Sequence, residues 1–199
     1  MTSETRDGRL ERSSATRRAI LQAARELLVE SASKPTAREI AERADVTTRT
    51  LFRHFSEMES LYRTLVEEAQ AEVAQIMDTP AAAICTEERW HARRDHLIER
   101  RVRVYEYVLP LYVAGVWPGD GSQLDSAQQL AIVKHRRARL RASLPEHIVK
   151  DSVLFEAIDA TLTIGYWASL RRDQGLSRNR AREVLSRALQ QLTEVSSST

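Results

Sequence analysis

The chain has 199 residues, of which 42% are hydrophobic and 29% are charged, and its formal net charge is +2. A chain of this kind can bury a core in one domain or two small ones, while so small a charge excess does not by itself indicate a nucleic-acid partner. The single cysteine, Cys85, excludes an intramolecular disulfide and a thiolate-cluster metal site, and no run of 18 apolar residues suggests a membrane span. We therefore expect a cytoplasmic protein with no cofactor, no metal and no membrane partner.

Helix-forming residues dominate the sequence. Only six glycines and five prolines interrupt it, which predicts an all-α fold of about nine helices. The polar segment 1–13 is expected to be a flexible N-terminal arm, with Ser13 or Ser14 capping the first helix. That helix carries an apolar stripe at helical spacing, formed by Ile20, Ala23, Ala24, Leu27 and Leu28.

Two short helices are predicted between residues 36 and 55. Thr36 and Glu39 have the spacing of a capping box, and Asp45 is suited to the left-handed conformation that ends a helix. Thr47 then caps a second short helix that reaches Phe55. Two capped helices joined by a tight turn are typical of a helix-turn-helix, and the first and fourth helices must supply the apolar surface on which they fold.

The remaining helices are longer. Ser56 and Glu59 predict a second capping box at the start of the fourth helix. Pro80 is expected to close this helix, and Pro110 to end or kink the one that starts at Glu87. Further helices are expected up to Leu144, from Pro145, from Asp151 or Ser152 to Gly175, and from Ser177.

The second short helix carries the side chains that suit DNA. Arginine can pair bidentately with guanine, and threonine can bond a base or a phosphate. Short capped helices with outward arginines are also common on solvated surfaces, so this pattern alone leaves both interpretations open. The outward residues are Thr48, Arg49, Thr50 and Arg53.

Four segments of the sequence favour DNA binding. Residues 20–28, 36–44, 46–55 and 61–62 resemble the DNA-binding domain of the TetR family of regulators, over roughly residues 14–65. The resemblance implies that Thr47 caps the recognition helix and that Thr48 and Arg49 read bases. It further implies that Thr50, Phe52, Arg53 and His54 contact phosphates or adjacent base edges. Arg38 matches a position that can also contact DNA.

Three positions depart from the family pattern. Asp45 stands where glycine is usual, Phe52 where tyrosine is usual, and Met58 where a phosphate-binding lysine is frequent. Phe52 cannot donate a hydroxyl bond, and Met58 removes one contact to a phosphate. DNA binding is therefore expected to rest more on the arginines and threonines.

The second half of the chain has residues suited to a small-molecule pocket and to a dimer interface. Aromatic side chains with a few polar groups line many ligand sites, which indicates a largely apolar effector. Asp159 could line such a pocket or pair with an arginine between Arg136 and Arg141. The pocket candidates are Trp90, Tyr105, Tyr112, Trp117, Phe155, Asp159, Leu162 and Tyr166.

The last helices are too apolar for one exposed pair, so we expect a homodimer. In the resembled family these helices form a four-helix bundle with their symmetry mates, and the dimer binds a pseudo-palindromic operator in double-stranded DNA until an effector releases it, as repressors do. The expected domains are the arm 1–13, the helix-turn-helix 14–55, the connecting helix 56–79, the ligand-binding and dimerisation domain 80–195, and a frayed tail 196–199. The interface candidates are Leu154, Ile158, Leu185, Ala188, Leu189 and Leu192.

Two other functions stay open. A helical interaction module that has lost DNA binding would fit the changes at Phe52 and Met58. An all-α enzyme would need convergent acid-base or metal-binding side chains, but His91 and His96 are five residues apart and point away from each other on a helix. No phosphate-binding glycine loop is present either. We therefore do not expect an enzyme.

Overall fold

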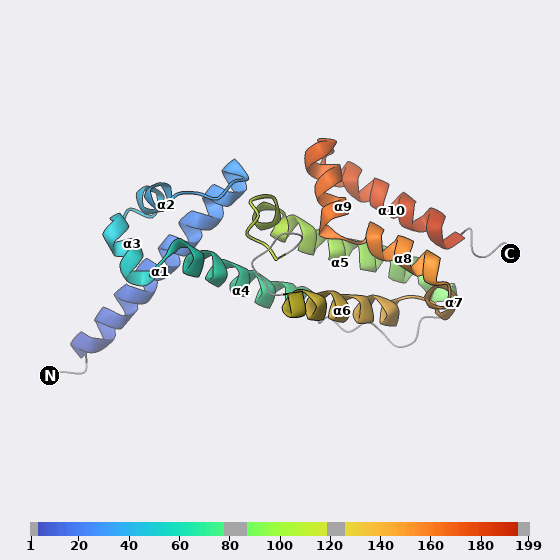
Figure 1. Ribbon diagram of the computed structural model, residues 1–199, viewed down its shortest axis with the longest axis horizontal. Helices are drawn as coiled ribbons and strands as arrows, with labels where there is room; N and C mark the ends of the chain where they lie inside the picture. The colour runs from blue at the N-terminus through green and yellow to red at the C-terminus, as the bar shows by residue number, and fades with distance from the viewer. Residues whose placement is uncertain (1–3, 78–86, 119–125, 195–199) are drawn as a thin grey trace. The chain divides into compact units, whose positions relative to one another are not determined.

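The computed structural model describes residues 4–77, 87–118 and 126–194. Their regular structure is helical throughout, which confirms the all-α prediction (Figure 1). The Pro80 helix end and the tail 196–199 lie outside these residues. The helices are α1 (Glu4–Ser31), α2 (Ala37–Arg43), α3 (Thr48–His54), α4 (Met58–Met77), α5 (Glu87–Val113), α6 (Ser126–Ser143), α7 (Glu146–Lys150), α8 (Ser152–Thr161), α9 (Ile164–Ala168), the π-helical segment η1 (Ser169–Asp173) and α10 (Arg178–Glu194).

The chain divides into two compact units. The first contains Met1–Ala71 and Pro110–Ser122, and the second contains Glu72–Leu109 and Gln123–Thr199. The division along α4 falls after Ala71. None of the described helices is both long and apolar enough to cross a membrane.

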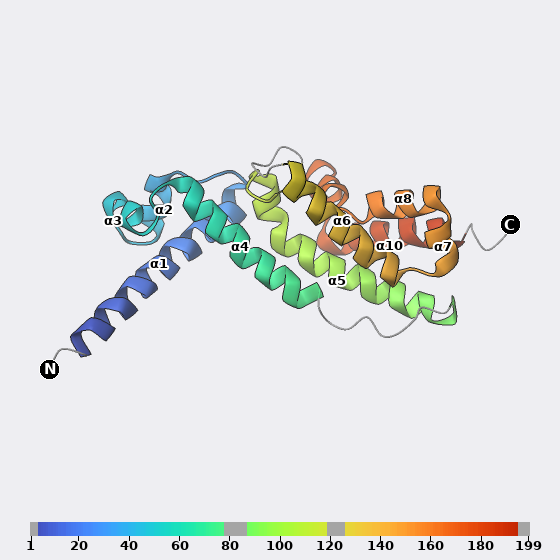
Figure 2. The same cartoon turned by 60° about the horizontal axis from the view of Figure 1, so that its bottom comes forward.

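The first unit is built around α1, against which α2 and α3 pack (Figures 1 and 2). The predicted stripe of α1 is buried there except for Leu27, which is partly exposed, and α3 and α4 add further buried apolar side chains. Burial of such side chains drives short helices to fold that would not be stable alone. The largest fully buried side chains of this unit are Ile20, Leu28, Ile40, Leu51, Phe55, Leu61 and Leu65.

The start of α1 differs from the prediction. The helix begins at Glu4, so residues 4–13 are helical and do not form an arm without regular structure. Ser14 does not cap the helix: its hydroxyl donates to the Glu11 carbonyl at 2.9 Å, a bond made inside a helix. Arginine and glutamate are good helix formers, and Gly8 alone does not stop the helix from extending.

Two helix ends in the second half of the chain also differ from the prediction. Pro110 lies inside α5, and the helix continues to Val113. Pro110 lacks an N–H and so removes one internal hydrogen bond, but only three residues of the helix follow it. The turn after α5 uses Gly115 at φ +67°, and the amides of Val116 and Trp117 donate to the Leu111 carbonyl.

The expected helix from Ser152 to Gly175 is interrupted. α8 ends at Thr161, and the hydroxyl of Thr163 accepts from the Tyr166 amide at 3.2 Å to begin α9. A side-chain cap of this kind competes with continued α-helix. The described residues therefore form ten α-helices, where about nine were predicted. Gly175 has φ +64°, as expected of the residue after a helix.

Candidate nucleic-acid interface

The first helix of the predicted helix-turn-helix begins with the predicted capping box. The Thr36 hydroxyl accepts from the Glu39 amide at 3.3 Å, and the Thr36 amide donates to the Glu39 carboxylate at 2.7 Å. These bonds from Thr36 lower the pKa of Glu39. They satisfy two amides that the start of a helix otherwise leaves without partners.

The turn between α2 and α3 is tight and has a left-handed residue. Asp45 has φ +52°, and the Val46 amide donates to the Ala41 carbonyl at 2.9 Å. Aspartate tolerates this conformation better than most residues other than glycine, so the departure at Asp45 preserves the turn. The Thr47 hydroxyl then accepts from the Thr50 amide at 3.1 Å, which confirms Thr47 as the N-cap of α3.

The helix α3 has one buried face and one exposed face. Leu51 is fully buried against the core of the first unit. On the other side Thr48, Arg49 and Arg53 are exposed, and Phe52 is 44% exposed. Arg49 and Arg53 are four residues apart and so project from the same side of the helix. An amphipathic short helix of this kind presents cationic and hydrogen-bonding groups to solvent.

Two predicted contact residues are less accessible. The Thr50 hydroxyl is 3.0 Å from that of Thr47, so it is already engaged within the cap. His54 is partly buried, and its Nε2 has no hydrogen-bond partner in the described part of the chain. Burial, followed by the nearby charges of Arg53 and Arg17, lowers the pKa of His54. The imidazole is therefore neutral at pH 7 and adds no charge to this surface.

Arg38 is exposed on α2, and its charge has a partner. Its Nε lies 2.7 Å from the Glu42 carboxylate, and the hydrogen bond to Glu42 raises the pKa of Arg38. Both side chains are mostly exposed, so the pair is worth little in water. A phosphate could replace Glu42 at low cost.

Arg17 fixes the end of α3, a role that the sequence did not reveal. Its guanidinium donates to the His54 carbonyl at 3.0 Å and to the Thr64 hydroxyl at 3.2 Å. It also lies 4.1 Å from the centroid of the Phe55 ring. One side chain of α1 thereby joins the C-terminal end of α3 to the first half of α4. No spacing rule connects residues so far apart in the sequence.

Tyr62 holds the start of the helix-turn-helix. Its hydroxyl donates to the Pro35 carbonyl at 2.6 Å, and burial raises the pKa of Tyr62 to about 12. This bond joins α4 to the residue just before the Thr36 cap. Arg43, at the other end of α2, pairs with Glu30 of α1 at 2.7 Å. Both ends of α2 are thus attached to longer helices.

The predicted second capping box does not form. α4 begins at Met58, so Ser56 does not occupy the N-cap position. The Ser60 hydroxyl donates to the Glu57 carbonyl at 2.8 Å. Met58 is partly exposed in the first turn of α4, where it offers no charge to a phosphate.

The eight pocket candidates are divided between the two units. Tyr112 and Trp117 belong to the first unit and are partly exposed. The other six belong to the second unit, where Tyr166 is partly exposed and the rest are buried. The buried ones are Trp90, Tyr105, Phe155, Asp159 and Leu162.

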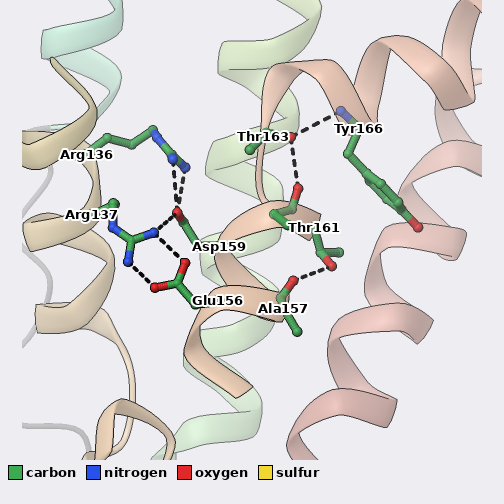
Figure 3. Close-up of polar contacts among 9 residues, drawn as sticks. Arg136, Arg137, Glu156, Ala157, Asp159, Thr161, Thr163 and Tyr166 are labelled. Atoms are coloured by element: carbon green, nitrogen blue, oxygen red, sulfur yellow. Dashed lines mark hydrogen bonds and ion pairs between the residues drawn. The ribbon is translucent and has the colours of Figure 1, made fainter. Parts of the chain in front are cut away.

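Asp159 has the arginine partners that the sequence allowed. Its carboxylate accepts two hydrogen bonds from Arg136, at 2.7 and 3.1 Å, and one from Arg137 at 2.7 Å (Figure 3). Arg137 also pairs with Glu156, and this bond lowers the pKa of Glu156. The cluster ties α6 to α8.

Four of the six residues predicted for a dimer interface are buried within the single chain. Leu154 is 9% exposed, and Ile158, Leu185 and Leu189 are fully buried, in a single chain. Their apolar surface is covered because α8 packs against α10. The sequence argument assumed that a partner chain was needed to cover it. Ala188 and Leu192 remain partly exposed on α10.

Within the described ranges, no group of three or more histidine, cysteine, aspartate or glutamate side chains is placed to hold a metal ion. The arrangement that stands out is the capped pair α2–α3, with a cationic exposed face on its second helix. Such a pair, supported by α1 and α4, defines a helix-turn-helix DNA-binding protein.

Comparison with known families agrees with this class. Residues 20–65 match the model of the bacterial regulatory proteins of the tetR family. The match identifies residues 20–65 as a TetR-type DNA-binding domain and the protein as a TetR-type DNA-binding transcriptional regulator. The match covers α2, α3 and the adjoining parts of α1 and α4. A search among curated proteins found no match to the chain.

Proposed function

We propose that this regulator is a dimeric repressor that binds a pseudo-palindromic operator through α3 and is released by a small-molecule effector. The observation that carries the proposal is the exposed face of α3, where Arg49 and Arg53 lie opposite the buried Leu51. In this arrangement Thr48 and Arg49 contact bases, while Arg53 contacts a phosphate or a neighbouring base edge. Arg38 adds a contact to a phosphate, which takes the place of the Glu42 carboxylate as its ion-pair partner.

The dimer is proposed to form through the outer sides of α8 and α10. Val153 is 78% exposed on α8, and Ala157 is partly exposed four residues later. Val184, Ala188 and Leu192 are partly exposed at helical spacing on α10. Because α8 and α10 pack together, a partner chain could contact the exposed apolar side chains of both helices. A two-fold axis through these side chains would give an isologous interface and two recognition helices.

Regulation of transcription needs no catalytic centre, and we propose that the protein is not an enzyme. We also propose that it acts in the cytoplasm, where its DNA would lie. The effector would bind in the second unit, among the buried aromatic residues. It would favour a conformation in which the distance between the two recognition helices no longer matches the operator, so that operator affinity falls.

A salt titration of DNA binding tests the proposal. Binding to a random duplex, measured by fluorescence anisotropy, should weaken steeply with salt because each phosphate contact releases counterions. The Arg49→Ala/Arg53→Ala variant should lose binding. Arg103→Ala/Arg172→Ala removes the same charge from exposed positions of the second unit and should bind as the wild type does.

Two outcomes would contradict the proposal. Unchanged binding by Arg49→Ala/Arg53→Ala would remove α3 from the interface. No binding by the wild type at low salt would favour an interaction module without DNA binding. Selection from random duplexes would then give the operator sequence, whose half-site spacing of about 10 base pairs tests the dimer.

A further inference from the structure

One side of α5 buries four side chains that can donate hydrogen bonds. Trp90, Arg94, Arg101 and Tyr105 are 6%, 8%, 6% and 4% exposed. Their spacings of four, seven and four residues place them along a single face of the helix. Arginine is rarely buried to this degree without a partner.

Five donor atoms of these side chains have no hydrogen-bond partner in the described part of the chain. The indole Nε1 of Trp90, the Nε and Nη1 of Arg94, the Nε of Arg101 and the hydroxyl of Tyr105 are buried and make no hydrogen bond there. The Nε of Arg94 lies 3.5 Å from the carboxylate of Asp95, but outside hydrogen-bond geometry, and Asp95 is mostly exposed. A buried donor without an acceptor destabilises a protein, and a buried cation does so more strongly.

Arg101 is the central case. No acidic side chain among the described residues forms an ion pair with it, although Asp159 lies close enough to act on the neighbouring Tyr105. Arg136 and Arg137 occupy Asp159 with three hydrogen bonds (Figure 3). The cluster thus pairs charges of α6 with those of α8, and among the described residues no carboxylate forms an ion pair with Arg101.

Tyr105 completes a pair of donors with Arg101. The two residues are one helical turn apart, and the charge of Arg101 acts on the Tyr105 hydroxyl. Burial is the largest influence and raises the pKa of Tyr105, so the hydroxyl keeps its proton at neutral pH. A guanidinium offers donors only, and the protonated phenol beside it can add one more O–H donor, which suits an anionic oxygen.

The surroundings add positive charge and apolar surface. Arg100 and Arg139 both donate to the Met77 carbonyl. Burial, followed by the nearby charges of Arg101 and Arg139, lowers the pKa of Arg100. Leu97 and Ile98 are buried on the same face of α5, between Arg94 and Arg101. An anion with an apolar body matches both properties.

We propose that Arg101 and Tyr105 bind the anionic group of an organic acid, a carboxylate or a phosphate monoester, whose apolar body lies along Leu97 and Ile98 toward Arg94. This site is the effector site of the proposed function and rests on it. The anion supplies the acceptors that Arg101 and Tyr105 lack. Trp90 is about 22 Å from Tyr105 along the helix, at 1.5 Å per residue, so only an elongated acid would reach it.

Thermal unfolding with small probes tests the site. The acids are benzoate, octanoate and phenyl phosphate, and the neutral counterparts are benzamide and octanamide. At about ten times its Kd, an acid should raise the Tm of the wild type by about 3–6 °C, while the amides should not. Stabilisation by benzoate or octanoate alone identifies a carboxylate, and by phenyl phosphate alone a phosphate ester.

Two variants of α5 make the test specific. Arg101→Met should lose the Tm increase with every acid, and its Tm without a probe should rise because a buried charge without a counterion is removed. Arg103→Met is the matched control, since Arg103 is exposed on another face of α5, and it should keep the increase. Tyr105→Phe keeps the ring and removes one donor, so the affinity for the acid should fall by about five- to tenfold.

The outcomes decide between the site and the wider function. The site is refuted if no acid stabilises the wild type, if the amides stabilise it equally, or if Arg101→Met responds as the wild type does. If Arg101→Met fails to fold, the response of Tyr105→Phe decides. DNA binding by the wild type without a probe is measured separately: its absence contradicts the proposed function, whereas DNA binding without an acid response contradicts only the anion site.

Discussion

Replacement of Arg17 by methionine should destabilise the helix-turn-helix. The substitution keeps most of the aliphatic side chain and removes the hydrogen bonds to the His54 carbonyl and the Thr64 hydroxyl. Because Arg17 is partly exposed, each bond is assigned about 1 kcal/mol rather than the larger value for a buried charged donor. The stacking on Phe55 adds about 0.5–1 kcal/mol. The free energy of unfolding should fall by about 2–3 kcal/mol.

Urea unfolding followed by circular dichroism measures this change. Arg18→Met is the matched control, since Arg18 is exposed on the same helix, and it should change the free energy by less than about 0.5 kcal/mol. Arg17→Lys keeps the charge but not the planar guanidinium that donates to two acceptors. Its free energy of unfolding should lie between those of the two methionine variants. If Arg17→Met and Arg18→Met unfold at the same urea concentration, Arg17 does not fix the end of α3 as argued.

Three further changes follow from the same contacts. Thr47→Ala removes the cap of α3 and should cost about 1 kcal/mol in urea unfolding, while Thr48→Ala, one residue later and exposed, should not. The pKa of Tyr62 is about 12 in the folded chain and about 10 when unfolded, so its contribution to stability is complete below pH 10 and is lost as the pH rises toward 12. Tyr62→Phe should flatten that part of the stability profile, and an unaltered profile would contradict the assignment. Asp159→Asn should lower the Tm, because it leaves Arg136 and Arg137 less well paired, whereas Asp173→Asn, at an exposed position, should leave the Tm unchanged.

The local features of the helix-turn-helix could be predicted because they depend on residues close in sequence. The Thr36–Glu39 capping box, the Thr47 cap and the left-handed Asp45 each involve neighbours within four residues. The buried Leu51 and the exposed Arg49 follow in the same way from helical spacing. The class of the protein rests on these features.

Helix ends were less predictable, since good formers and breakers compete there. The α1 helix continues through Ser14, whose hydroxyl turns back to the Glu11 carbonyl instead of capping. The expected helix after Ser152 stops at Thr161, where Thr163 caps a new helix. In both places a serine or threonine had two hydrogen-bonding options, and the sequence does not say which is used.

Local sequence patterns were sufficient to predict that the chain is helical, that it carries a helix-turn-helix, and which side chains α3 exposes. The packing of distant segments sets which groups meet: Arg17 holds the end of α3, α8 covers the leucines of α10, and the Nε of Arg101 is buried with no hydrogen-bond partner among the described residues. The difference lies in how far apart in the sequence the interacting residues are. Caps and helical faces arise from neighbours in the chain, whereas burial and charge pairing depend on which elements pack together.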